Sequence, residues 1–194
     1  MKKDDRTFLP QTSDIEAVYQ KAKYRKNFYE AMRSTIFMFI VVAAFAVLVA
    51  VLFLPILRIY GKSMNGTVNS GNVVVSMKTN KFKTGDVVSF YYNNNILVKR
   101  VIAKSGDWVD IDKKGNVYVN QKKIKEPYLS SKAYGKTNIK LPYQVPEDRI
   151  FVMGDNRSVS IDSRNKSVGS VANEQIVGRL VFKIWPLSDI GLVK

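Results

Sequence analysis

The sequence predicts a mostly β domain that follows a single N-terminal membrane-spanning helix. From Thr35 to Leu57 the chain has 23 residues without a charge. Beyond Tyr60, short runs of β-branched and aromatic residues alternate with turn residues, which is typical of coiled antiparallel sheets. We therefore expect a cytoplasmic N-terminal segment (1–34), a transmembrane helix (35–57) and an extracytoplasmic β domain (58–194).

The uncharged run is long enough to cross a bilayer as a helix. It would reach roughly 35 Å, and the hydrocarbon core is roughly 30 Å thick. A cleavable export signal is the first alternative, but its apolar region has only about 7–15 residues, and here 34 residues precede the run. A fully buried helix of a soluble protein is the second alternative, and the length of the run disfavours it.

Basic residues on the two sides of the run predict its orientation. Residues 1–34 carry 8 basic and 5 acidic side chains, whereas only Arg58 and Lys62 follow the run closely. The positive-inside rule then places the N-terminus in the cytoplasm and the β domain outside, in a bacterial cell membrane.

The charge of the chain suggests anionic partners. The net charge is +15, and residues 58–194 carry 23 basic and 11 acidic side chains. Such a domain beside a bilayer would be attracted to anionic lipids or anionic wall polymers. The sequence contains no nucleic-acid-binding motif, so we do not expect nucleic acid as a partner.

Two residue types are missing, and their absence narrows the possible chemistry. The chain has no cysteine, which excludes disulfides, cysteine nucleophiles and thiolate metal sites. It also has no histidine, which excludes Ser-His triads and the commonest zinc ligands. A serine hydrolase built from this chain would need another base.

Local patterns predict one further helix start and several strands. Ser13 and Glu16 have the spacing of a capping box, so a helix should begin near Asp14. Lys114-Gly115-Asn116 is typical of a hairpin turn, and the polar stretch Ser130–Pro142 is expected to be a long exposed loop. The predicted strands are Asn72–Met77, Asp86–Tyr92, Ile96–Lys104, Trp108–Asp112, Asn116–Asn120, Ile150–Met153 and Gln175–Ile184.

Ser63 and Lys99 are the first two candidate functional residues. Ser63 stands in Gly61-Lys62-Ser63-Met64, where glycine allows close approach of another backbone, although such a segment is also common in ordinary turns. Lys99 lies in a predicted strand and shares a face with apolar residues. Burial there would lower its pKa and make it a candidate base, whereas an edge-strand lysine that prevents aggregation is the simpler alternative.

A third candidate segment runs from Met153 to Arg164. Its Gly, Asp, Asn, Ser and Arg residues are too polar for a strand and predict a hydrogen-bonded loop with an Asp–Arg pair. A hydroxyl group from this loop could orient Lys99, and the ion pair could hold the site rigid.

In this order, the segments resemble those of the type I signal peptidases, particularly the short Gram-positive form with one N-terminal anchor. The resemblance covers about residues 35–186. The matching segments are Gly61–Met64 with Thr67, Thr84–Phe90, Val98–Ala103 with Gly106-Asp107, Val117–Asn120, Glu126–Leu129, and Met153–Arg157 with Ser160, Asp162, Ser163 and Arg164.

The resemblance implies a serine endopeptidase without metal or cofactor. Its nucleophile would be Ser63, its general base Lys99, and Ser160 would position Lys99. The backbone N–H of Ser63 would contribute to the oxyanion hole, and the substrates would be exported preproteins with small residues before the cleavage site. The remaining supporting residues would be Gly61, Asp155, Asp162 and Arg164.

The chain departs from the family pattern after the serine–methionine pair. Gly66 stands where the family usually has proline, and Val68 where it usually has leucine. Glycine would loosen this turn or accommodate a different substrate backbone. A specialised pilin-processing peptidase, or a weakly active relative that serves as an assembly chaperone, is therefore the alternative function.

Overall fold

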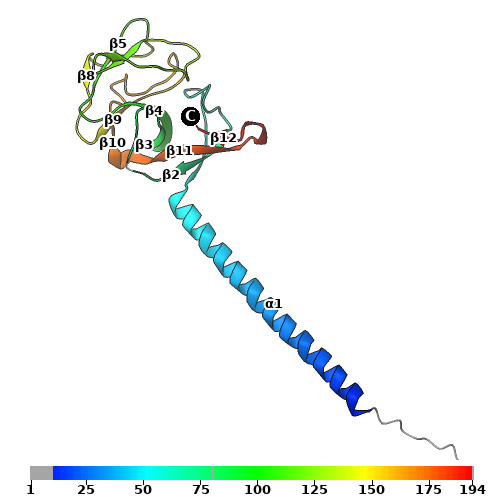
Figure 1. Ribbon diagram of the computed structural model, residues 1–194. Coiled ribbons are helices and arrows are strands. Elements are labelled where there is room, and N and C mark those ends of the chain that lie inside the picture. The colour runs from blue at the N-terminus through cyan, green and yellow to red at the C-terminus, as the bar shows by residue number, and fades with distance from the viewer. Residues whose placement is uncertain (1–10, 80, 194) are drawn as a thin grey trace, which may run out of the picture. The chain divides into compact units, whose positions relative to one another are not determined.

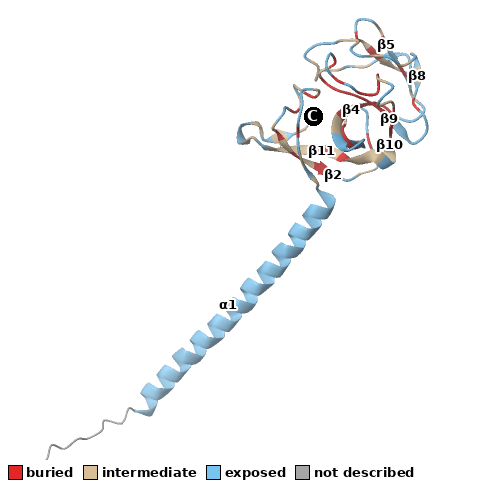
Figure 2. Ribbon diagram, turned by 180° about the vertical axis from the view of Figure 1, so that it is seen from behind, coloured by how far each residue is buried: buried red, intermediate tan, exposed pale blue. Residues whose placement is uncertain are grey.

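The computed structural model describes residues 11–79 and 81–193, and it divides the chain into two compact units, 1–50 and 51–194 (Figure 1). Helix α1 (Thr12–Phe53) has 42 residues. In the part of the chain that the structure describes, it is the one helix long and apolar enough to cross a membrane, judged by length and composition. None of its residues is buried against the rest of the protein (Figure 2).

Both ends of α1 differ from the expectation. The helix begins at Thr12 rather than near Asp14, because the carbonyl of Gln11 already accepts the N–H groups of Asp14 and Ile15. It ends at Phe53 rather than Leu57, because Pro55 cannot donate a helical hydrogen bond and disfavours helical geometry in the residue before it. The membrane-spanning segment 35–57 stays a prediction.

The second unit is built from short strands. Their bounds are β1 (Ile56–Arg58), β2 (Val73–Met77), β3 (Val87–Tyr92), β4 (Asn95–Ala103), β5 (Trp108–Ile111), β6 (Val117–Val119), β7 (Lys122–Lys123), β8 (Tyr143–Gln144), β9 (Arg149–Met153), β10 (Val171–Ala172), β11 (Ile176–Trp185) and β12 (Gly191–Leu192). Two 3-10 turns, η1 (Asn173–Gln175) and η2 (Leu187–Asp189), flank β11.

The strands form two antiparallel sheets, which confirms the predicted fold class. The large sheet has the order β1-β2-β11-β3-β4-β9-β10, with β12 also paired to β11. The small sheet has the order β7-β6-β5-β8 and lies at the end of the unit away from β2 (Figures 1 and 2). The turn at Gly115 (φ +79°) joins β5 and β6, as predicted.

All seven predicted strands exist, each within one residue of its expected bounds. The strands that the sequence did not reveal have two or three residues: β1, β7, β8, β10 and β12. Segments of two or three residues are too short to show an alternation of apolar and polar side chains. They form strands because longer strands offer them a free edge. The stretch Ser130–Pro142 contains neither helix nor strand, as expected for a loop.

Apolar side chains between and beneath the sheets form three core clusters. One fills the space under the small sheet, and a second packs around β3, β4 and β9. The third contains Ile59, Met64 and Val68, which belong to the segment between β1 and β2. Because this segment is anchored in the core on both sides of Ser63, the position of Ser63 is set by packing as well as by hydrogen bonds.

Candidate active site

Ser63 lies in a tight loop whose next residues are held in the core. Met64 is buried, and its carbonyl accepts the N–H groups of Thr67 (3.1 Å) and Val68 (3.0 Å). Gly61 has φ +92°, and a Cβ atom there would have nothing within 4 Å. The backbone beside Ser63 is therefore open on one side, which leaves room for a second chain.

Lys99 meets Ser63 from strand β4. The Lys99 Nζ atom donates a hydrogen bond to the Ser63 Oγ atom, at 2.8 Å. The two residues are 36 positions apart in sequence, and the lysine is only 3% exposed. The structure thus brings the first two candidate residues into direct contact, in a geometry that suits proton transfer between them.

Burial lowers the pKa of Lys99 from 10.5 to about 8. Among charged neighbours, Asp162 and Asp155 raise the pKa while Arg164 lowers it, and burial dominates. About one molecule in ten would then carry a neutral Lys99 amine at pH 7, compared with fewer than about one in a thousand for an ordinary lysine. A proton acceptor is therefore present near neutral pH without histidine.

The loop that follows β9 packs directly against the backbone of Ser63. The Asn156 N–H donates to the Ser63 carbonyl at 2.9 Å. A Cβ atom on Gly154 would lie 2.6 Å from that same carbonyl oxygen and would also collide with the side chain of Ser160. Glycine is therefore needed at position 154 for close approach, not for an unusual backbone angle.

Ser160 is buried beside this contact, but it makes no hydrogen bond to Lys99. Its Oγ atom has no hydrogen-bond partner among the residues that the structure describes. The Ser160 side chain nevertheless makes a small contribution to the lowered pKa of Asp162. The implied role of Ser160 in positioning Lys99 stays a prediction.

Asp162 and Arg164 form a buried ion pair. Arg164 Nε donates to Asp162 Oδ1 and Nη2 donates to Oδ2, each at 2.9 Å, while the N–H of Gly154 donates to Oδ2. Burial alone would raise the pKa of Asp162, but the bonds to Arg164 and Gly154 hold it below its usual value. Arg164 also binds the carbonyls of Ala133 and Tyr134, so the pair fixes the long 130–142 loop to the site.

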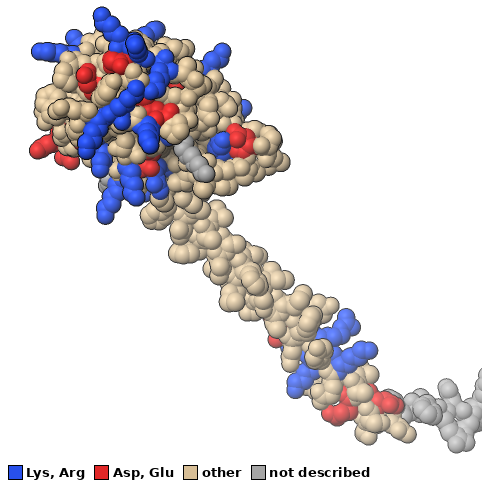
Figure 3. Space-filling view, turned by 45° about the horizontal axis from the view of Figure 1, so that its top comes forward, with Lys and Arg blue, Asp and Glu red and all other residues tan. Residues whose placement is uncertain are grey.

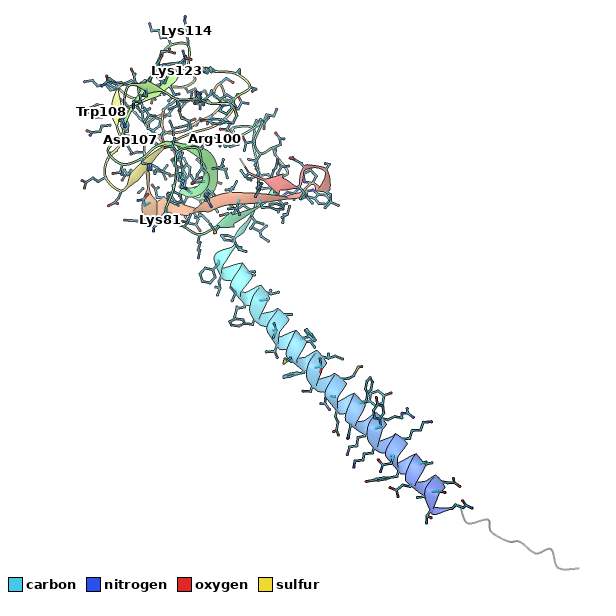
Figure 4. The ribbon with its side chains drawn as sticks, viewed as in Figure 1. Lys81, Arg100, Asp107, Trp108, Lys114 and Lys123 are labelled. Carbon is cyan, nitrogen blue, oxygen red and sulfur yellow. The ribbon has the colours of Figure 1, made fainter. Side chains whose placement is uncertain are left out.

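Asp155 pairs with Arg100, a residue that the sequence analysis missed. Arg100 Nε and Nη2 donate to the two Asp155 oxygens at 2.8 and 2.7 Å. Thr67 donates its hydroxyl proton to Asp155, and the Arg100 guanidinium lies 3.9 Å from the centre of the Tyr128 ring. Figure 4 shows Arg100 on the strand at the centre of the unit. This cluster therefore connects β4, the Ser63 loop and the loop after β9.

The sequence carried a signal for Arg100. In a strand, Lys99 and Arg100 must point to opposite faces. We expected one of the two to be buried or at an edge, but both are buried. A buried arginine requires a carboxylate partner. Because Arg100 follows Lys99 in the strand, the sequence could have predicted a second ion pair between Arg100 and an acid of the polar loop.

A groove of about 460 Å³ leads to the Ser63–Lys99 pair. One wall comes from the segment that carries Ser63, and the other comes from the β3–β4 turn and β4. The lining of the groove is partly apolar, and the groove is large enough for part of an extended peptide. The lining residues are Leu57, Arg58, Ile59, Tyr60, Gly61, Ser63, Met64, Asn94, Asn95, Ile96, Leu97, Val98 and Lys99. Among the described residues, no cluster of three or more acidic side chains could hold a metal ion.

Comparison with known proteins identifies the family. A family model described as signal peptidase, peptidase S26, matches residues 32–185. The chain belongs to the peptidase S26 signal peptidases. Enzymes of this family are serine endopeptidases, so the predicted enzyme class is confirmed.

Curated relatives carry the same name. Signal peptidase I of Bacillus amyloliquefaciens is 37% identical over 145 residues, which cover 69% of this chain and 77% of the relative. Signal peptidase I T of Bacillus subtilis (strain 168) is 35% identical, with 77% and 87% covered. Signal peptidase IB of Staphylococcus aureus (strain COL) is 36% identical, with 68% and 78% covered.

A crystal structure of a signal peptidase I from Enterococcus faecalis V583 is also similar. It is 28% identical, the alignment covers 52% of this chain and 97% of that one, and the TM-score is 0.45.

Proposed function

We propose that this signal peptidase removes N-terminal signal peptides from exported preproteins with Ser63 as the nucleophile and Lys99 as the general base. The observation that carries the proposal is the 2.8 Å hydrogen bond between Lys99 Nζ and Ser63 Oγ, made by a lysine that is almost fully buried. Family membership supplies the reaction class, and the geometry supplies the two reacting groups.

The reaction would begin with proton transfer from Ser63 to the neutral Lys99 amine. The Ser63 oxygen would then attack the scissile carbonyl carbon and form a tetrahedral intermediate. As this collapses to an ester, the Lys99 ammonium would give its proton to the departing amine. Lys99 would next take a proton from a water molecule, whose oxygen attacks the ester. As the ester bond breaks, the Lys99 ammonium would return that proton to the Ser63 oxygen, which restores both groups.

Backbone groups near Ser63 suit the developing oxyanion. The Ser63 carbonyl is held by Asn156, which fixes the peptide plane that follows the nucleophile. The open side of Gly61 would let the substrate carbonyl approach the Ser63 N–H, which we propose as one oxyanion-hole donor. Donors held in place before substrate arrives need no reorganisation during the reaction.

The groove would hold the residues before the scissile bond in an extended conformation. Its apolar wall beside Ser63 favours apolar side chains, and the family resemblance implies that those before the cleavage site are small. Gly154 would act on the reaction through the geometry of Ser63 and Lys99, whereas Asp155, Asp162 and Arg164 would also act through the pKa of Lys99.

We further propose that the chain crosses the membrane once within the segment 35–57, of which α1 forms residues 35–53, with residues 1–34 in the cytoplasm and 58–194 outside. The apolar helix supports membrane attachment, and the basic residues before it support this orientation. Confining the enzyme and a membrane-held substrate to one layer raises their effective concentration.

The alternative of a pilin-processing peptidase or assembly chaperone is not favoured. The relatives are signal peptidases, and both reacting groups are present and in contact. Gly66 has φ +104°, an angle that proline cannot adopt, so the departure from the family pattern alters the turn rather than the reacting pair.

Cleavage of a model preprotein by the full chain in liposomes tests the proposal. Ser63→Ala should abolish cleavage without loss of fold, because it deletes one hydroxyl from a partly exposed loop. Ser158→Ala, which deletes an exposed hydroxyl from the neighbouring loop, is the matched control and should cleave normally. A Ser63→Ala variant with most of the original rate would refute Ser63 as the nucleophile.

A further inference from the structure

One segment of the β domain is unusually rich in lysine. Residues 113–140 contain 8 lysines and one acidic residue, Glu126. The side chain of Glu126 is fully buried and is paired with Arg157, so it offers no charge to the surface. All eight lysines are exposed, which leaves this part of the surface strongly positive.

Six of these lysines lie together on and around the small sheet. Register places Lys123 beside Tyr118 and Lys122 beside Val119, so β7 forms a lysine-bearing edge of the sheet. Lys132 joins them because its Nζ atom donates to Asn116 Oδ1 at 2.9 Å, next to the β5–β6 turn. We call the following residues the lysine face: Lys113, Lys114, Lys122, Lys123, Lys125 and Lys132.

Nearby acids do not neutralise the lysine face. Among the described residues, none of its six lysines forms an ion pair within 4.0 Å. Asp112, the nearest acid along the chain, binds the backbone and side-chain amides of Asn116; these bonds and the charge of Lys123 lower its pKa, so Asp112 stays charged and offsets only part of the six positive charges. Asp107 binds Asn120, and Asp110 binds the N–H of Ile111. The face therefore presents unpaired positive charge.

The lysine face is remote from the end of the unit that follows the apolar helix. Strand β1 begins three residues after that helix ends and pairs with β2, and β2 and β5 lie at opposite ends of the unit (Figures 1 and 2). Figure 4 shows Lys114 and Lys123 at the β5 end, and Lys81 at the other. Figure 3 shows that lysine and arginine side chains cover much of one side of the unit, with fewer acidic side chains among them.

We propose that the lysine face binds a soluble linear phosphodiester polymer. Charge complementarity selects a polyanion, since several unpaired lysines along one sheet edge match a chain with one negative charge per repeat. The lysines are spread over an edge strand, a turn and a loop, which a flexible soluble polymer can follow more closely than a flat layer of lipid headgroups can. The groove that leads to Ser63 shares no lining residue with the lysine face, so both can be occupied together.

The test is a titration of the full chain, held in neutral phosphatidylcholine nanodiscs, with poly(glycerol phosphate). Binding should weaken with salt, because the polymer's counterions are released on contact. The triple variant Lys114→Gln, Lys122→Gln, Lys123→Gln should lose about tenfold or more in affinity. For this variant, the slope of log affinity against log salt concentration should shrink in magnitude by about 2, because each lost lysine–phosphate contact contributes about 0.7.

The control triple variant, Lys78→Gln, Lys81→Gln, Lys83→Gln, removes the same charge from the exposed β2–β3 connection. It should keep its affinity within about twofold, and both variants should cleave a preprotein at the normal rate. Equal losses of affinity in the two triple variants would mean that only net charge matters, and would overturn the site. Absence of polymer binding to the original chain would also overturn it. A further arm places the chain in phosphatidylglycerol nanodiscs without polymer and measures chemical acetylation of lysines. If these nanodiscs protect Lys114 and Lys123 from acetylation, lipid is the occupant and the proposal is overturned.

Discussion

Arg100 and Asp155 form a two-bond ion pair that is almost fully buried, directly behind the residue that contacts Ser63. Because Arg100 follows Lys99 on the same strand, the pair fixes the strand from one face while Lys99 uses the other. Thr67 and the Tyr128 ring complete the surroundings of the guanidinium.

Removing one partner of this pair should destabilise the β domain strongly. Asp155→Ala leaves a buried guanidinium without its carboxylate, so the free energy of unfolding should fall by about 3–5 kcal/mol. Denaturant titration followed by tryptophan fluorescence measures this change. Asp189→Ala, which breaks the partly exposed pair with Lys183, is the control and should cost no more than about 1 kcal/mol. Equal losses in the two variants would contradict the prediction.

The pH dependence of cleavage should reveal the lowered pKa of Lys99. Activity needs the neutral amine, so kcat/KM should rise with pH along a limb centred near pH 8. Lys99→Arg should be inactive although it keeps the charge, because arginine stays protonated. A limb that appears only above about pH 10, where an ordinary lysine titrates, would contradict a buried base.

The same burial should make Lys99 costly for stability. The pKa is about 8 in the folded state and 10.5 for an exposed lysine, so folding disfavours the charged amine. The cost is full below pH 8, shrinks as pH rises through 8–10.5, and is absent above that window. At pH 7 the free energy of unfolding of Lys99→Met should therefore exceed that of the original chain by about 3 kcal/mol. Measured at pH 10.5 or above, this advantage should nearly vanish; a constant difference would assign it to packing instead.

Gly66 should not tolerate the proline that the family usually has there. Its φ of +104° lies far from the value of about −65° that proline requires. Gly66→Pro should lower both the thermal midpoint and the cleavage rate, and Gly66→Ala should have a smaller effect of about 1 kcal/mol. A proline variant as stable as the original chain would mean that the loop adopts the family backbone in solution.

Gly154 should be needed for the contact between the two loops of the site. An added methyl group would lie 2.6 Å from the Ser63 carbonyl oxygen, so the loops must separate. Gly154→Ala should cost about 1–3 kcal/mol of stability and should lower kcat more than it raises KM. Gly191→Ala is the control, because a Cβ atom there meets nothing within 4 Å. Unchanged kcat in Gly154→Ala would show that the contact does not position Ser63.

The sequence predicted the long strands for clear physical reasons and singled out Ser63 and Lys99 as candidates, whose roles the family resemblance implied. The long strands alternate or carry continuous β-branched runs, and Lys99 stands out because a cation in such a run must be buried or at an edge. The two-residue strands β7 and β10 were not predictable, because their pairing depends on neighbours far away in sequence. Arg100 was missed although its place beside Lys99 in the strand carried a signal; the identity of its partner Asp155, which lies 55 positions further along the chain, was the part that the sequence did not indicate.

Under the proposed mechanism, the alternation of Lys99 and Arg100 makes activity depend on the register of one strand. A slip of β4 by a single residue against β3 would exchange the two side chains between faces. Arginine would then face Ser63, and since it cannot accept a proton, no hydrolysis would follow. A chain whose sheet has not yet paired correctly is therefore inert toward its neighbours in the membrane, including newly made copies of itself.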